Sequence, residues 1–205
     1  MLEFISNEHN LFPNPMWQIQ IKGVDNDAIK EYCYHLKDNT EGVTISNRGG
    51  WHSKEIIQPL PDALTELFTN FEGFVNDYCA QITGLNNLML GNFWVNINQK
   101  YDYNRTHDHQ NSILSAVYYV DAEGEDIGNF VAERDDSAEF FLGSYKNVSG
   151  FTGTSFAITP LTGFAFVMPS WMLHSVEQNL TDRDRISIAF NFVNPDVVVD
   201  NSYGQ

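Results

Sequence analysis

The sequence is poor in cysteine and in basic residues, and both shortages limit what the protein can do. Its 205 residues include two cysteines, Cys33 and Cys79, so one disulfide is the most it could form. Buried free thiols are the preferred interpretation, because both cysteines lie in segments of helical periodicity. Lysine and arginine total 11 against 27 acidic residues, a formal net charge of −16. Such an excess repels phosphate backbones, so we expect no nucleic-acid partner.

Long apolar runs, repeats and linkers are also missing. No segment approaches the length of a membrane-spanning helix, so we expect no membrane partner. The first residues include Glu3 and Glu8 where a signal peptide would have a basic start and an apolar run, so a cytoplasmic location is predicted. No linker or low-complexity tract divides residues 1–205, which we interpret as a single domain. The oligomeric state stays open, a homodimer included.

Apolar and aromatic side chains, by contrast, are plentiful. Apolar residues make up 42% of the chain, which supports a packed core. The 15 phenylalanines, 9 tyrosines and 4 tryptophans suit the half-buried surfaces of β-sheets. An all-β or mixed fold is therefore favoured.

Two amphipathic helices are predicted in the first part of the chain. The first begins at Asp25 or Asn26, either of which can cap it, and runs to Lys37. The second begins at Pro61, since proline suits a first helical turn, and ends at Gly84. Its apolar residues recur at steps of three and four, so we interpret that face as core.

A β-rich region is predicted over about residues 88–193, after the helical part over about 25–84. Several short strands at close spacing suggest a sandwich or barrel, with the helices covering one outer face. Chemistry is then expected inside the barrel mouth, where inward side chains converge. The short aromatic or β-branched runs, separated by turn residues, are 88–98, 113–120, 128–132, 138–142, 151–159, 163–168, 173–177 and 186–193.

Two histidines flank Asp108 between two of these strand patterns. On a strand, alternate residues share a face, so His107 and His109 would point together while Asp108 points away. Two imidazoles on one face can bind a metal, although this short motif alone is a weak signal. His174 begins a later strand, and pairing of neighbouring strands could bring it to the same place.

Arg185 and Ser187 share a face of the last strand, opposite Ile186. An arginine that points into an apolar barrel needs an anion, because an unpaired buried charge is costly. The far end of a dicarboxylate is a natural partner, since the guanidinium group binds carboxylates with two parallel hydrogen bonds. The alternative is a surface ion pair with Asp182 or Asp184.

Taken together, these segments form an ordered pattern that resembles the iron(II)- and 2-oxoglutarate-dependent dioxygenase superfamily, in its prolyl-hydroxylase-like branch. The resemblance runs from about Trp94 to Phe192. It implies a mostly β fold with flanking helices, a double-stranded β-helix of the jelly-roll or cupin kind. It also implies an oxygenase that uses Fe(II), 2-oxoglutarate and O2, and that hydroxylates a C–H bond of a small-molecule or peptide substrate such as a prolyl or other amino-acid residue.

The resemblance also assigns roles to individual residues. The metal ligands would be His107, His109 and His174. The distal carboxylate of 2-oxoglutarate would be held by Arg185 and Ser187, and the second tyrosine of the Tyr118-Tyr119 pair would reach the same co-substrate.

A closer resemblance is to a little-characterised bacterial and phage subgroup of these oxygenases. If the chain is phage-encoded, the host cytoplasm is its expected location. The marks of the subgroup are Phe12 to Pro15, Ser46 to Trp51, Trp94 to Asn98, the two histidine segments, and Arg185 to Asn191.

The metal motif departs from the superfamily at one position. The superfamily usually has a carboxylate two residues after the first histidine, whereas this chain has His-Asp-His. Either three imidazoles hold the iron, or Asp108 binds it and one histidine does not. Strand alternation favours three histidines.

Further candidates lie outside the motif. Asn96 and Asn98 share a strand face and could hydrogen-bond the co-substrate. Arg48 and Trp51, in a glycine-containing loop, could contact a substrate at the entrance or simply plug the barrel end. Two rival classes also stay open: a metal cupin that does not use 2-oxoglutarate, and a non-catalytic jelly-roll binding or structural protein.

Overall fold

The computed structural model describes residues 14–56, 59–135 and 152–196. Within these residues it contains two β-sheets, in which all strand pairs are antiparallel. The larger sheet, called here the major sheet, has six strands in the order β1-β9-β6-β11-β4-β3. Their bounds are Trp17–Gln20 (β1), Phe164–Pro169 (β9), Leu114–Asp121 (β6), Arg185–Val193 (β11), Met89–Asn98 (β4) and Trp51–His52 (β3).

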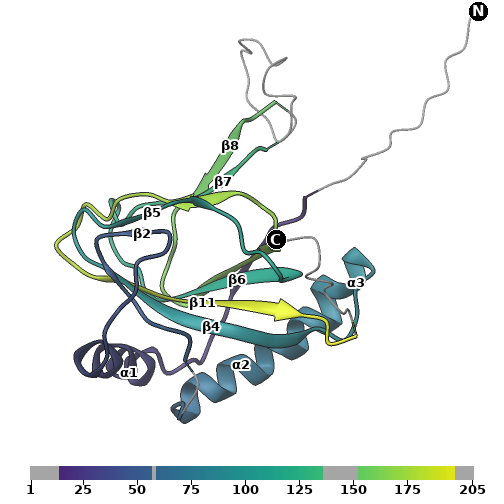
Figure 1. Ribbon diagram of the computed structural model, residues 1–205, viewed down its shortest axis with the longest axis horizontal. Helices are drawn as coiled ribbons and strands as arrows, with labels where there is room; N and C mark the ends of the chain where they lie inside the picture. Colours follow the sequence, from purple (N-terminus) through teal and green to yellow (C-terminus); the bar gives the residue numbers. More distant parts are fainter. Residues whose placement is uncertain (1–13, 57–58, 136–151, 197–205) are drawn as a thin grey trace, which may run out of the picture.

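The smaller sheet, called here the minor sheet, has five strands in the order β2-β5-β10-β7-β8. It faces the major sheet, and the β7–β8 hairpin extends from it (Figure 1). Two facing antiparallel sheets of this kind form the expected double-stranded β-helix. The bounds are Asn47–Arg48 (β2), Tyr103–His107 (β5), His174–Val176 (β10), Phe130–Glu133 (β7) and Ser155–Ile158 (β8).

The helices cover the outer face of the major sheet (Figure 1). Helix α1 (Asn26–Asn39) is capped by the Asp25 side chain, whose Oδ1 accepts a hydrogen bond of 3.0 Å from the Ala28 amide. Helix α2 (Asp62–Phe74) continues through a π-helical turn, η1 (Val75–Cys79), into α3 (Ala80–Thr83). The helix then ends at Gly84, which has a φ of 72° and so adopts the left-handed conformation that favours glycine.

The main hydrophobic core lies between the helices and the major sheet. Phe71 of α2 packs edge-to-face on Phe190 of β11, with ring centroids 5.1 Å apart, and Phe68 contacts the same ring at 5.3 Å. Alternate residues of β11 supply this core, because one face of the strand points at the helices. Cys33 and Cys79 are buried in the same core, and the structure forms no disulfide between them.

Most of the predicted elements are present, with small shifts at their ends. The strands predicted from residue 88 onward correspond to β4, β6, β7, β8, β9, β10 and β11, and the segment 138–142 lies outside the described residues. Three strands were not predicted: β1, β2 and β3. The strand expected to carry both His107 and His109 is β5, and it ends at His107. The break in α-helical geometry at η1 was not predicted either. No helix in the described part of the chain is both long and apolar enough to cross a membrane.

Candidate metal centre

Three histidines converge between the two sheets. His107 ends β5 and His174 begins β10, and the two are direct partners in the antiparallel register. His109 lies two residues beyond β5, where its backbone amide donates a 2.9 Å hydrogen bond to the Ser170 carbonyl. One ring nitrogen from each histidine lies within 4.8 Å of the other two. Among the described residues this is the only such group of histidine, cysteine or acidic side chains that could hold a metal ion.

Each of the three rings has an acceptor on its Nδ1 atom. The Nδ1 of His107 lies 2.7 Å from the Arg105 carbonyl, and that of His174 lies 2.9 Å from the Met172 carbonyl. The Nδ1 of His109 lies 2.7 Å from Oδ1 of Asn191. Because a carbonyl oxygen can only accept, Nδ1 carries the proton in each ring. Every Nε2 then presents a lone pair, which is the form of histidine that binds a metal.

Burial keeps these imidazoles neutral. Desolvation, together with repulsion from the other two rings, lowers the pKa of His174 to about 3. Desolvation lowers the pKa of His109 to about 4, and it also lowers the pKa of His107. At neutral pH the three rings are therefore unprotonated at Nε2, so a cation need not displace a proton to bind them.

The structure separates Asp108 from the histidine group. The strand ends at His107, so the irregular segment that follows, and not strand alternation, carries His109 back into the cavity. The Asp108 side chain is exposed and is not among the grouped metal-ligand atoms.

Arg185 is buried in the same cavity, with 1% of its surface exposed. Its Nη1 donates to the Ile127 carbonyl at 2.6 Å and to the Glu177 carbonyl at 3.0 Å. Its Nη2 is buried and has no hydrogen-bond partner among the described residues. The carboxylates considered as surface partners bind elsewhere: Asp182 pairs with Lys100, and Asp184 accepts a hydrogen bond from Tyr34. A buried guanidinium with a free donor is a site for an anion.

Other polar groups point into this cavity without a partner. The hydroxyl of Tyr119 is buried and unpaired, and burial raises its pKa, so it stays a hydrogen-bond donor. Oδ1 of Asn96 is also buried and unpaired. Asn98 and Ser187 line the same cavity, and the register pairs Ser187 with Tyr119 across β11 and β6. The cavity thus offers one cation and several neutral polar groups close to the histidines.

Aromatic rings that the sequence did not reveal as site residues complete the cavity. Phe130 of β7 stacks on the His174 ring, with centroids 5.3 Å apart and planes 19° apart. Trp94 contacts the His109 ring, with centroids 5.3 Å apart, and His52 stacks on Trp94, with centroids 5.6 Å apart. Trp94 shares a strand face with Asn96, so the period of two could have assigned it to the cavity.

The two residues expected at a substrate entrance are not in the cavity lining. Trp51 packs against the core on the helix side of the major sheet. The Arg48 guanidinium donates to the carbonyls of Asn47 and Ile45 at 2.6 and 3.3 Å.

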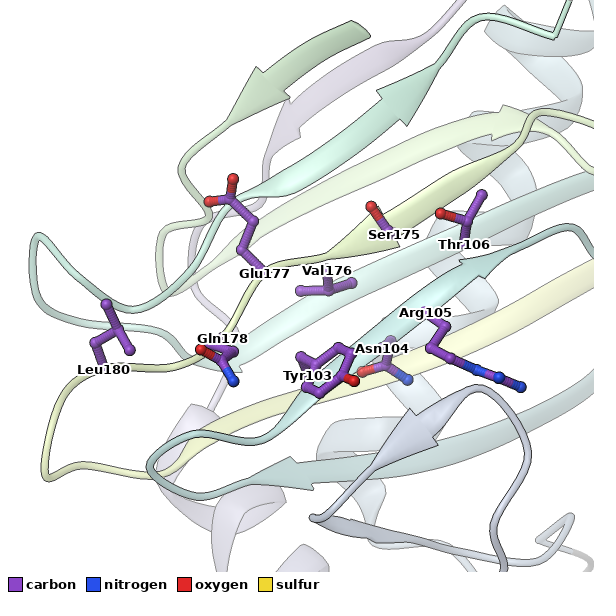
Figure 2. Close-up of a pocket in the computed structure, with 9 residues that line it drawn as sticks. All are labelled: Tyr103, Asn104, Arg105, Thr106, Ser175, Val176, Glu177, Gln178 and Leu180. Carbon is purple, nitrogen blue, oxygen red and sulfur yellow. The ribbon is translucent and has the colours of Figure 1, made fainter.

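A wider, open groove of about 990 Å³ runs along β5 and β10 (Figure 2). Thr106 and Ser175, next to the histidines in sequence, line it, so it lies largely on the opposite side of the minor sheet. None of the three histidines lines this groove.

The fold and the buried site fit a class: double-stranded β-helix proteins in which a group of histidines that could hold a metal lies in one cavity with a buried arginine. Residues 92–191 match a family model described as "Putative 2OG-Fe(II) oxygenase". This match agrees with the 2-oxoglutarate/iron(II)-dependent oxygenase superfamily expected from the motifs, and it spans the three histidines and Arg185. No curated protein sequence matches the chain.

Solved structures share the fold at low sequence identity. A prolyl-4-hydroxylase from Pseudomonas putida is similar with a TM-score of 0.63 and 16% identity, over 88% of this chain and 93% of that one. A viral collagen prolyl hydroxylase from Paramecium Bursaria Chlorella virus-1, in complex with 2OG, gives 0.59 and 10%, over 86% and 94%. HygX from Streptomyces hygroscopicus, with nickel and 2-oxoglutarate bound, gives 0.58 and 13%, over 89% and 84%.

Proposed function

We propose that this chain is an oxygenase that holds iron(II) with His107, His109 and His174 and hydroxylates a C–H bond of a small-molecule or peptide substrate. In the same proposal, Arg185 binds the distal carboxylate of 2-oxoglutarate. Tyr119 and Ser187 assist it, and Asn96 and Asn98 supply further hydrogen bonds.

One observation carries the proposal: Arg185 is buried in the same cavity as the histidines and keeps an unpaired Nη2. Leaving a guanidinium donor unpaired in the interior is costly unless an anion arrives to bind it. A metal cupin that works without 2-oxoglutarate has no use for this cation, and neither has a jelly-roll protein without a ligand. A dicarboxylate that reaches both the metal and Arg185 gives the buried guanidinium a role.

The protein's own residues would act by binding, orienting and excluding water. The three Nε2 atoms would hold iron, and Arg185 with the neutral polar groups of the cavity would hold the co-substrate beside it. A bound iron would supply the oxidation of 2-oxoglutarate by O2 to succinate and CO2, with one oxygen atom going to succinate and the other to the substrate C–H bond. Phe130 and Trp94 pack against the histidine rings and would keep water from the reacting atoms.

Peptidyl or free amino acids are the first substrates to test, because the similar structures include two prolyl hydroxylases. The experiment measures succinate formed from 2-oxoglutarate with iron(II), ascorbate and oxygen, with and without proline-containing peptides, free amino acids and small metabolites. A substrate should raise succinate formation and gain one oxygen atom by mass spectrometry. The His174→Ala variant serves as the control and should form no succinate above background.

One further measurement separates the parts of the proposal. Calorimetry with 2-oxoglutarate tests the co-substrate without needing the right substrate. If the wild-type protein with iron binds no 2-oxoglutarate, the cavity serves another anion and the proposed reaction is wrong.

A further inference from the structure

We propose that Asn191 is the positioning residue for His109: its side-chain amide fixes the imidazole in the form that presents Nε2 to the metal. The inference rests on the proposed metal site and adds a residue that touches neither the metal nor the co-substrate.

The three histidines are held in two different ways. His107 and His174 donate Nδ1–H to the backbone carbonyl two residues earlier, at Arg105 and Met172. Those acceptors belong to the same strand or to the turn before it, so they are present wherever the local backbone is formed. His109 has no such local acceptor and uses Oδ1 of Asn191, 82 residues away on β11. Its ring orientation therefore depends on a side chain of the opposite sheet.

The orientation of the Asn191 amide is itself fixed by neighbours on two other strands. Asn191 is 5% exposed, and its direct partner on β6, Ser115, is fully buried. The Ser115 hydroxyl donates to Oδ1 of Asn191 at 2.7 Å, and Nδ2 of Asn191 donates to Oδ1 of Asn92 at 2.9 Å. With His109 and Ser115 both donating to it, Oδ1 uses both of its lone pairs.

A bulge in the major sheet places Asn92 for this contact. The β4–β11 register shifts between Phe190 and Phe192, which pair with Phe93 and Leu90. Gly91 and Asn92 therefore lie together opposite the single residue Asn191. Bulges re-aim side chains beside functional sites. Three strands of the major sheet thus converge on one amide.

The direction of this amide selects the tautomer of His109. As it stands, Oδ1 faces the ring, so Nδ1 carries the proton and Nε2 is free. The reverse orientation would bring Nδ2 to the ring, make Nδ1 the acceptor and put the proton on Nε2, where it would block a metal. The Nε2 of His109 is buried and has no protein partner among the described residues, which agrees with a nitrogen kept for a metal.

The test compares four full-length proteins: wild type, Asn191→Ala, Asn191→Asp and Asn76→Ala. Alanine removes the acceptor, whereas aspartate keeps an oxygen for both His109 and Ser115. Asn76→Ala is the matched control, because Asn76 also makes three hydrogen bonds through its amide but does so between α2 and Leu88, away from the cavity. Cobalt(II) is the probe, and its affinity and ligand-field spectrum are measured for each protein.

We expect Asn191→Ala to bind cobalt(II) about 10- to 100-fold more weakly, as is usual when the hydrogen-bond partner of a metal-bound histidine is lost. Asn191→Asp should recover that loss, and Asn76→Ala should match the wild type in affinity and spectrum. A second readout needs no metal: long-range ¹H–¹⁵N NMR should show His109 with its proton on Nδ1 in the wild type and a tautomer mixture in Asn191→Ala.

Wild-type affinity and an unchanged tautomer in Asn191→Ala would overturn the inference while leaving the metal site in place. If Asn191→Ala does not fold, Ser115→Ala takes its place, with the same expected direction and the same overturning result. Failure of the proposed function looks different, because wild type would then bind no cobalt(II), or would bind it no better than His174→Ala.

Discussion

Replacing Tyr119 by phenylalanine should weaken 2-oxoglutarate binding without weakening the fold. The hydroxyl of Tyr119 is buried and unpaired in the cavity, beside Ser187 in the register. Burial raises its pKa, so it is a protonated donor at any working pH. A hydroxyl that donates to a charged carboxylate contributes about 1.5–3 kcal/mol, so the affinity should fall roughly ten- to a hundredfold.

The same change should leave the stability of the protein without co-substrate unchanged or slightly higher. An unpaired buried hydroxyl costs about 1–3 kcal/mol, and removing it leaves the ring packing on Phe166 intact. The free energy of unfolding, from urea titration of the metal-free protein, should therefore stay level or rise by about 1 kcal/mol. Calorimetry with 2-oxoglutarate supplies the other half of the test. Unchanged 2-oxoglutarate affinity together with a loss of stability would mean that the hydroxyl is structural, and the reasoning would be refuted.

Three other predictions follow from the site. Arg185→Ala should lower 2-oxoglutarate affinity at least tenfold by calorimetry; unchanged affinity would favour a cupin or another co-substrate. His109→Ala should lose iron by metal analysis while Asp108→Ala keeps it; the reverse result would make Asp108 the ligand, and iron in both would remove the case for an oxygenase. Acid should destabilise the metal-free protein between about pH 6.5 and 4, because the depressed pKa of His109 means that the folded state binds fewer protons than the unfolded state. The free energy of unfolding lost through His109 is about 3 kcal/mol. A melting temperature that stays constant across this pH range would contradict the prediction.

The β-rich half of the molecule could be predicted from sequence because its strands follow a period of two. Arg185 and Ser187 point into the cavity while Ile186 points to the helices, as that period requires. The helix ends were equally readable, since Asp25 and Gly84 carry the chemistry of an N-cap and a left-handed C-cap.

What could not be predicted depends on contacts between distant segments. Strands β2 and β3 have two residues each, too few to show any period, so Trp51 was not assigned to the core side of β3. His109 lies beyond the end of its strand, and its place in the cavity comes from the Ser170 carbonyl and Asn191. The role of Asn191 follows from a bulge and two partner strands, none of which leaves a local pattern.

The division of the three histidines between the sheets would give a metal bound there a mechanical role. Two of them lie on strands of the minor sheet and are held by their own local backbone, and one is held by a side chain of the major sheet, so an ion that binds all three would act as a brace between the layers. Its binding free energy then adds to the resistance of the two sheets to separation. Loading with metal would couple the opening of β5 and β10 to that of β11, and these strands would exchange their amide protons together. Removing the metal would let the two layers open separately, while the helices on the far side of the major sheet would keep their own protection.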